Sequence, residues 1–237
     1  MAKATIKDYI IKFSKEKPYF HIDELEKYLK KNEVKFTHKT LKQNIYLLKK
    51  GKLLHSAGRG WYSTIEKEFK LDKKPIKDIV KLIHSKFPLL NFSCWSTEQI
   101  KGYFQHLPSQ FITFIYSDKE YLTTIKDFLI EKDYTVYLNP HKQDIEKFVE
   151  LKSKNIIILR PSIMVCSLKD NIYARVEKIL VDLLFEMKKI NFMDKEEYIK
   201  IFSNIITNYR INLAKSLVYA YSRKKDDEIK EIINEII

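Results

Sequence analysis

Three of the four glycines in this chain lie within ten residues, and this clustering limits what the surrounding stretch can form. Gly51, Gly58 and Gly60 supply backbone conformations that residues with side chains resist, such as those of a helix end and a tight hairpin tip. Upstream, Leu41, Ile45 and Leu48 recur at the spacing of one buried helical face. Residues 37–64 therefore predict a basic helix followed by a hairpin, the arrangement of a winged helix-turn-helix.

Polar residues occupy the other sides of this predicted helix, where a DNA duplex could lie. The candidate DNA contacts on the helix are His38, Lys39, Lys42, Gln43, Tyr46 and Lys49. Arg59, at the predicted hairpin tip, suits a phosphate or a narrow minor groove. Packing of the hairpin onto the helices accounts for one of Trp61 and Tyr62, and this packing does not conflict with the predicted winged helix.

The positive charge of the chain is concentrated in the same region. Residues 1–74 hold 19 Lys and Arg against 9 Asp and Glu, a net charge of +10. Residues 75–237 hold 25 against 22, a net charge of +3. A general excess of lysine would raise the charge of both parts, so the asymmetry favours a nucleic-acid-binding domain joined to a second domain with another task.

The pattern along the chain predicts an α+β protein of two domains, residues 1–74 and 75–237. The first domain is expected to be a winged helix with a helix that ends near Lys17-Pro18, a short strand over 19–22 and a helix that starts at Asp23. Thr37 is expected to cap the third helix, and Lys52–Ser56 to pair with Gly60–Thr64. Residues 65–76 are charge-dense and predict a linker or an exposed connecting helix.

The second domain is predicted to be a small α/β core followed by a helical bundle. The expected strands are 91–95, 111–116, 134–138 and 156–159, and the expected helices are 97–106, 119–131 and 142–152. From Ala174 onward the apolar periodicity is helical. Cys94 and Cys166 show no metal-ligand spacing and are expected to be small buried residues of a cytoplasmic protein. The chain contains no apolar run long enough to span a membrane, so no membrane partner is expected.

No catalytic, metal or cofactor motif stands out in the sequence. Glu150 and Lys152 beside Asp144 have the spacing of a nuclease carboxylate–lysine pair, but the same Glu-x-Lys spacing recurs elsewhere in this lysine-rich chain, for example at Glu33/Lys35, Glu68/Lys70 and Glu228/Lys230. The chain lacks an Asp-x-Asp pair, a Gly-Ser turn and a phosphate-cradling P-loop. We therefore expect no enzymatic activity and no metal or other cofactor, although an active site assembled from distant residues stays open.

Three stretches, Asn91–Thr97, Val176–Leu183 and Tyr209–Asn212, resemble the AbiEi (abortive infection E) antitoxins of type IV toxin–antitoxin systems. The predicted order of domains in this chain, a winged helix followed by an α/β-plus-helical domain, also resembles that of the AbiEi family. The resemblance implies a repressor that binds repeats in its own promoter as double-stranded DNA and takes part in phage defence. It also implies that the second domain counters a cognate nucleotidyltransferase-like toxin.

Two sets of residues are candidates for this antitoxin function. Arg175, Glu177, Lys178 and Asp182 alternate with an apolar helical face, a pattern that is also typical of a solvated helix surface. Arg210 and Arg223 are candidates because a chain with only five arginines could keep them where planar, bidentate contacts matter. Two further functions stay open: a winged-helix regulator whose second domain senses a small ligand, and an enzyme directed to DNA.

Overall fold

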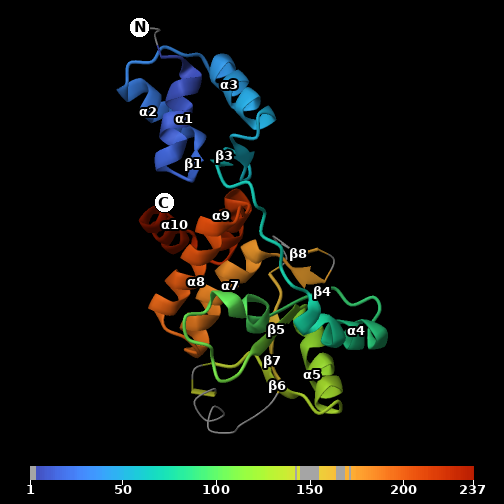
Figure 1. Ribbon diagram of the computed structural model, residues 1–237. Coiled ribbons are helices and arrows are strands. Elements are labelled where there is room, and N and C mark those ends of the chain that lie inside the picture. The colour runs from blue at the N-terminus through green and yellow to red at the C-terminus, as the bar shows by residue number, and fades with distance from the viewer. Residues whose placement is uncertain (1–3, 142, 145–154, 164–168, 171) are drawn as a thin grey trace.

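The computed structural model describes the chain apart from residues 1–3, 142, 145–154, 164–168 and 171 (Figure 1). The described residues form a mixed α+β structure with one three-stranded and one six-stranded sheet. Figure 1 shows the smaller sheet with its helices above the larger sheet with its helices. No helix in the described ranges is long and apolar enough to cross a membrane.

Residues 4–63 form the part that we call the N-terminal module. Its elements are α1 (Ile6–Glu16), β1 (Tyr19–His21), α2 (Ile22–Lys31), α3 (His38–Lys50), β2 (His55–Ser56) and β3 (Trp61–Ser63). Its strands are antiparallel in the order β1-β3-β2. Apolar residues of all three helices, including Phe13, Leu25 and Ile45, meet Phe20 of β1 in one core.

The local sequence explains where these helices begin and end. Thr5 and Asp8 form a capping box at the start of α1, and α1 ends before the Lys17-Pro18 step as predicted. The Thr37 hydroxyl accepts the Thr40 N–H at 3.1 Å and caps α3, also as predicted.

Two details of this module differ from the prediction. α2 begins at Ile22 instead of Asp23, because the imidazole of His21 accepts the Asp23 N–H and serves as the cap. The hairpin strands are shorter than expected, with only His55 and Ser56 paired on the first side. The short strands keep the hairpin tip close to the body of the molecule.

The C-terminal part, residues 74–237, begins with a short 3₁₀ turn, η1 (Lys74–Ile76). Up to the sheet's last strand its elements are α4 (Lys77–Lys86), β4 (Phe92–Ser96), η2 (Thr97–Tyr103), β5 (Ile112–Ser117), η3 (Lys119–Tyr121), α5 (Leu122–Ile130), β6 (Thr135–Leu138), β7 (Ile156–Pro161), β8 (Lys169–Asp170) and β9 (Tyr173–Ala174). The remaining helices are α7 (Val176–Ile190), α8 (Lys195–Asn208), α9 (Leu213–Ser222) and α10 (Asp226–Ile236). The helix predicted over 142–152 lies largely outside the described residues, as does Cys166.

The six-stranded sheet has the order β6-β7-β5-β4-β9-β8 and separates two layers of helices. β5, β6 and β7 run parallel, whereas β4 is antiparallel to β5. Alternate residues of β5 face opposite layers: Ile115 packs with α4 and α5, and Phe114 packs with α7. Cys94 of β4 is fully buried on the α4 and α5 side, as expected of a small apolar residue.

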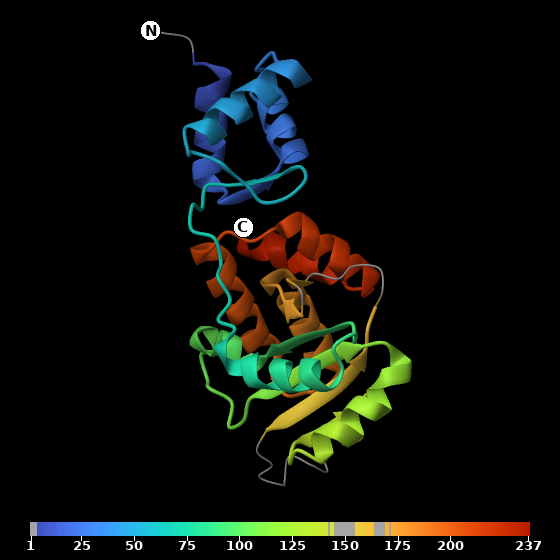
Figure 2. The same ribbon diagram turned by 90° about the vertical axis from the view of Figure 1, so that its right-hand side faces the viewer.

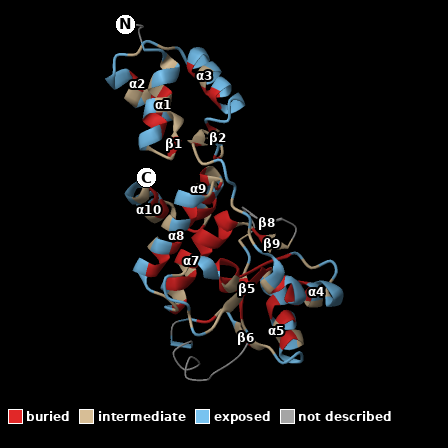
Figure 3. Ribbon diagram, viewed as in Figure 1, coloured by how far each residue is buried: buried red, intermediate tan, exposed pale blue. Residues whose placement is uncertain are grey.

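α7 is buried on nearly all sides, as its red colour in Figure 3 shows. The sheet covers one side of α7, and α8 and α9 pack against the others. A helix in this position cannot keep a solvated face. The prediction that Glu177, Lys178 and Asp182 lie on a solvated surface is therefore wrong, since each is less than 9% exposed.

Residues 64–73 connect the two parts, and we call them the connector. The connector is extended instead of helical, and Glu68 forms an isolated β-bridge with Arg210. The core around α7 also includes Tyr19 and Ala57 of the N-terminal module. The two parts are thus packed together on both sides of the boundary predicted at Lys74.

Candidate nucleic-acid interface

The exposed face of α3 carries most of the residues that were predicted from the sequence to contact DNA. Leu41, Ile45 and Leu48 are buried and orient the helix on the core of the module. The opposite face exposes His38, Lys39, Lys42, Gln43, Tyr46 and Lys49. Tyr46 has a relative exposure of 60%, which is large for an aromatic residue.

The lysines of this face are available to a ligand. Ion pairs within the described N-terminal module join Lys17 to Glu24, His21 to Asp23 and His38 to Glu26, and none involves a lysine of α3. His38 is less available than predicted, because its imidazole lies 3.2 Å from the Glu26 carboxylate. The face therefore offers unpaired positive charge beside an amide and an aromatic ring.

The β2–β3 hairpin tip is exposed at one residue and packed at its neighbours. Arg59 is exposed, as predicted. Gly58 has a φ of +112°, and a Cβ at this position would overlap Asn212 Oδ1 and the Ala214 side chain. The Ala214 N–H donates to the Ala57 carbonyl oxygen at 3.3 Å. The tip is thus anchored on the start of α9, with only the Arg59 side chain turned to solvent.

The segment Tyr209–Asn212 joins the N-terminal module to the C-terminal part. The buried Tyr19 hydroxyl donates to the Tyr209 carbonyl oxygen and accepts the Ile211 N–H, both at 2.8 Å. Arg210 donates to the carbonyl oxygens of Ile65 and Glu66 in the connector at 3.0 and 2.6 Å. The Arg210 guanidinium therefore makes several hydrogen bonds at once, as predicted for an arginine kept in this chain, but its partners lie within the chain.

Asp182 is the centre of a buried ion cluster between α7 and α9. Its carboxylate pairs with the Lys178 ammonium, accepts from Arg223 Nη2 at 2.8 Å and accepts the Tyr219 hydroxyl at 2.7 Å. Arg223 is 9% exposed, so this second predicted arginine is also engaged inside the protein. In this conformation Lys178, Asp182 and Arg223 contribute to packing and not to an exposed contact surface.

Glu186 extends the buried cluster by one helical turn. It accepts two hydrogen bonds at 3.0 Å from Arg160 Nε and one at 2.5 Å from Nη2, and the Tyr116 hydroxyl adds another at 3.0 Å. Sequence reasoning missed Arg160 and Glu186. A signal was present, because Lys178, Asp182 and Glu186 follow each other at i, i+4 and i+8 on an otherwise apolar helix.

Burial and pairing set the protonation of this cluster. Burial lowers the pKa of the Lys178 ammonium to about 8, although Asp182 opposes the shift. For Asp182, burial alone would raise the carboxyl pKa, but Lys178 and Arg223 hold it below its ordinary value. Burial raises the pKa of the Tyr116 and Tyr219 hydroxyls. The cluster is therefore held as paired charges and neutral phenols at neutral pH.

Arg175 and Glu177 lie at the start of α7, away from this cluster. Arg175 precedes the helix and is half-buried. Glu177 Oε1 accepts the Asn212 N–H at 2.8 Å and so ties α7 to the Tyr209–Asn212 segment. Of the six residues predicted for antitoxin function, Arg175 and Arg210 are the two that retain intermediate exposure.

A family model described as a family of unknown function, DUF6577, matches residues 40–237. The match covers 198 of the 237 residues. This chain belongs to the DUF6577 family. A comparison of the DUF6577 chain with curated proteins gives no match.

The matched region of this DUF6577 chain begins within α3 and includes the hairpin and the whole C-terminal part. α1, β1 and α2 precede it. Within the described residues of the DUF6577 chain, no three His, Cys, Asp or Glu side chains are grouped so that they could hold a metal ion. Glu150 and Lys152, which have the spacing of a nuclease carboxylate–lysine pair, lie outside the described residues.

Proposed function

We propose that the chain binds double-stranded DNA, with the N-terminal module acting as a winged helix-turn-helix and α3 as the recognition helix. The observation that carries the proposal is the exposed face of α3, where Lys39, Lys42 and Lys49 are free of ion pairs within the described module. The element order and the strand order β1-β3-β2 support the assignment, because a winged helix has this arrangement.

The chemistry of the face divides into two kinds of contact. Lysine ammonium groups bind backbone phosphates, which gives affinity without sequence preference. The Gln43 amide can donate to and accept from an adenine edge in the major groove, which gives sequence preference. Tyr46 lies between Gln43 and Lys49 along the helix, and its exposed ring can contact a sugar or a thymine methyl group.

The test is duplex binding by the full chain, first on a random-sequence pool and then on the selected sequence. Log affinity should fall with log salt at a slope of about −0.9 per phosphate contacted. Lys42→Glu or Lys49→Glu should weaken binding to all duplexes alike. Gln43→Ala should reduce discrimination at one base pair by about 1–3 kcal/mol.

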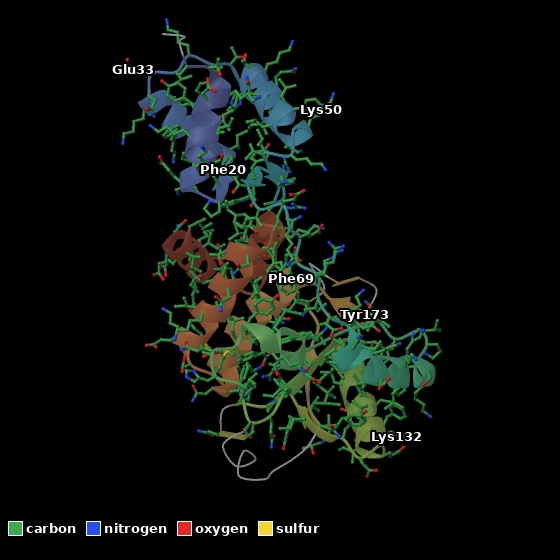
Figure 4. All side chains as sticks on the ribbon, viewed as in Figure 1. Phe20, Glu33, Lys50, Phe69, Lys132 and Tyr173 are labelled. Atoms are coloured by element: carbon green, nitrogen blue, oxygen red, sulfur yellow. The ribbon has the colours of Figure 1, made fainter. Side chains whose placement is uncertain are left out.

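Lys132→Glu is the matched control, because Lys132 is an exposed lysine two residues after α5, at the opposite end of the molecule (Figure 4). It makes the same charge reversal and should leave affinity nearly unchanged. Equal effects of Lys42→Glu and Lys132→Glu would show that only net charge matters, and the interface on α3 would then be wrong.

The cellular role that we propose is that of a cytoplasmic autorepressor and antitoxin of the AbiEi type. The resemblance of Asn91–Thr97, Val176–Leu183 and Tyr209–Asn212 supports it. The expected partner is a nucleotidyltransferase-like toxin encoded beside the gene. Co-expression of the full chain with the product of that gene should restore growth, and Arg59→Ala should derepress the promoter without abolishing rescue. Failure of the full chain to protect would remove the antitoxin role and leave DNA binding intact.

A second candidate function is control of DNA binding by a small ligand, and one cavity favours it. The cavity has a volume of about 600 Å³, in the usual range of ligand sites, and lies at the amino ends of β5 and β7. Its polar lining includes Ser96, Glu98, Thr113, Tyr134 and Asn155. The larger side chain of Thr113→Leu should fill this space. If the cavity is a ligand site, a metabolite that raises the melting temperature of the wild type should raise that of the variant less.

A further inference from the structure

A second cavity, of about 310 Å³, lies between the connector and the first turn of α7. One wall is formed by residues 68–71 and Lys73 of the connector. The other is formed by residues 174–177, and Arg210 lines the cavity as well. The cavity therefore lies where the segment leading from the N-terminal module passes over the C-terminal part.

Cationic side chains outnumber carboxylates in the lining of this cavity. The cations are Lys70, Lys73, Arg175 and Arg210, and the carboxylates are Glu68 and Glu177. Glu177 is buried and accepts the Asn212 N–H, so part of its hydrogen-bonding capacity is already used. Glu68 is 72% exposed and its carboxylate lies 3.7 Å from Arg210 Nη2. The cavity retains an excess of positive charge, which suits an anion.

The cationic groups of the lining are held by three separate segments. Arg210 is oriented by its bonds to the Ile65 and Glu66 carbonyl oxygens. The Lys73 ammonium lies over the Tyr173 ring, 4.9 Å from its centroid. Arg175, the N-cap residue of α7, makes no capping hydrogen bond with its side chain, and the start of the helix adds its partial positive charge to the same wall. Arginine, lysine and such amides together match the oxygens of a phosphate group.

α3 and the connector, which forms one wall of the cavity, lie on the same side of the molecule. Figure 2 looks onto this side and shows α3 at the front, with the connector running below it toward α4. Figure 4 shows the same order, with Lys50 at the end of α3, then Phe69 of the connector, then Tyr173 beside the cavity. A duplex on α3 that extends along this side would pass the cavity.

We propose that this cavity binds a backbone phosphate of the same DNA duplex that α3 contacts. The inference rests on the proposed DNA binding and extends the interface beyond the winged helix into the connector and the start of α7. The anion is recognised by Lys70 and Lys73, with Arg175 in the opposite wall adding positive charge, while Arg210 holds the connector in place. A free phosphate has the same chemistry, so the test separates the two sources.

The test compares a duplex of about one helical turn, 10 bp, with one of about three turns, both centred on the sequence that α3 prefers. The wild-type chain should bind the longer duplex more tightly, with a salt slope steeper by about 0.9 for one added phosphate contact. The Lys70→Gln, Lys73→Gln double variant should lose this extra slope and bind the short duplex as the wild type does. Lys126→Gln on α5 combined with Lys132→Gln just after it is the matched control and should keep the full difference.

Three other results are informative. Equal salt slopes for wild type and double variant on the long duplex, with normal short-duplex binding, would overturn the cavity assignment and leave the proposed function standing. If the double variant binds neither duplex while its melting temperature is unchanged, the cavity would not be a contact separate from α3, and the proposal would be overturned. In the third result, inorganic phosphate raises the melting temperature of the wild type but not that of the double variant, and both proteins bind the long duplex with the same affinity and salt slope. This result would assign the cavity to a free phosphate and overturn the nucleic-acid assignment.

The proposed function fails by a different result. It fails if the short duplex binds the wild type no better than it binds Lys42→Glu, whatever the long duplex does. Because the short duplex reports on α3 and the difference between duplexes reports on the cavity, the two failures are distinguishable.

Discussion

Asp182 and Glu186 are carboxylates with no exposed surface, and paired cations stabilise each of them inside the protein. Removing an ion from water is costly, and attraction within a buried pair offsets this cost only when the geometry and the hydrogen bonds are good. Lys178, Arg160 and Arg223 supply the compensating charges, and Tyr116 and Tyr219 supply further donors. At the residue scale, loss of one member should therefore matter more than the loss of a surface ion pair.

Asp182→Asn should lower the free energy of unfolding by about 3–5 kcal/mol, because Lys178 and Arg223 would remain buried without their counter-charge. Urea denaturation measures the change. Asp227→Asn removes the same charge from α10, where the carboxylate is 91% exposed, and should leave stability nearly unchanged. Similar losses for the two variants would contradict the stabilising role of the cluster.

The Lys178 ammonium predicts a pH dependence of stability. Its pKa is about 8 in the folded chain against an ordinary 10.5, so between these values the unfolded chain binds more protons than the folded chain. The contribution of Lys178 to stability should therefore rise with pH across this window, by up to about 1.4 kcal/mol per pH unit. The difference in unfolding free energy between wild type and Lys178→Met, measured at pH 7, 8 and 9, should grow. A constant difference would place the folded pKa near its ordinary value.

At the scale of single elements, the β2–β3 hairpin has two roles that compete for its tip. The tip exposes Arg59 to solvent, while Gly58 packs against the start of α9. A glycine is required there both by the positive φ and by the close approach of Asn212 and Ala214. The hairpin is therefore part of the joint between the two parts as well as a candidate DNA contact.

Gly58→Ala should lower the free energy of unfolding by about 1–3 kcal/mol, because the added methyl group forces the hairpin away from α9 and strains the backbone. Gly102→Ala is the control, since a Cβ at Gly102 would meet no atom within 4 Å. Guanidinium denaturation of both variants provides the comparison. If Gly58→Ala is as stable as Gly102→Ala, the hairpin does not dock in solution as it does here.

At the scale of the whole molecule, the N-terminal module and the C-terminal part share one core. Tyr19 and Ala57 belong to the core around α7, and Arg210 binds the connector. The two parts should therefore unfold together. The chain has two tryptophans. Trp61 in β3 packs against the core around α7, so it reports on the N-terminal module and its joint, whereas Trp95 in β4 reports on the C-terminal part.

Single-tryptophan variants Trp61→Phe and Trp95→Phe should give coincident unfolding transitions. Tyr19→Phe should separate them, with a loss of about 1–3 kcal/mol from the N-terminal transition, because the Tyr209 carbonyl and the Ile211 N–H would lose their shared partner. Tyr221→Phe, at a 73% exposed position, is the control and should keep the transitions coincident. Separate transitions in the otherwise unchanged chain would show that the two parts fold independently.

Local signals in the sequence were enough for most elements. Thr37 as a cap, Lys17-Pro18 as a helix end and the apolar runs of β4, β5, β6 and β7 depend on residues close in the chain, so they were predicted to within a few positions. The exposed face of α3 was predicted for the same reason, since the 3.6-residue period assigns its sides without reference to the rest of the molecule. α4 and the separate helix α10 were not predicted.

The tertiary structure alone decided whether the charged residues of α7 meet water or protein. The pattern of α7 predicts charges opposite an apolar face, but it does not reveal that the sheet covers one side and that α8 and α9 cover the others. Arg160 and Glu186 are 26 residues apart, and Tyr19 and Ile211 are 192 residues apart. Periodicity determines which residues share a face, because the helix repeat is local. Whether that face meets water or protein depends on contacts between distant segments, which only the folded chain brings together.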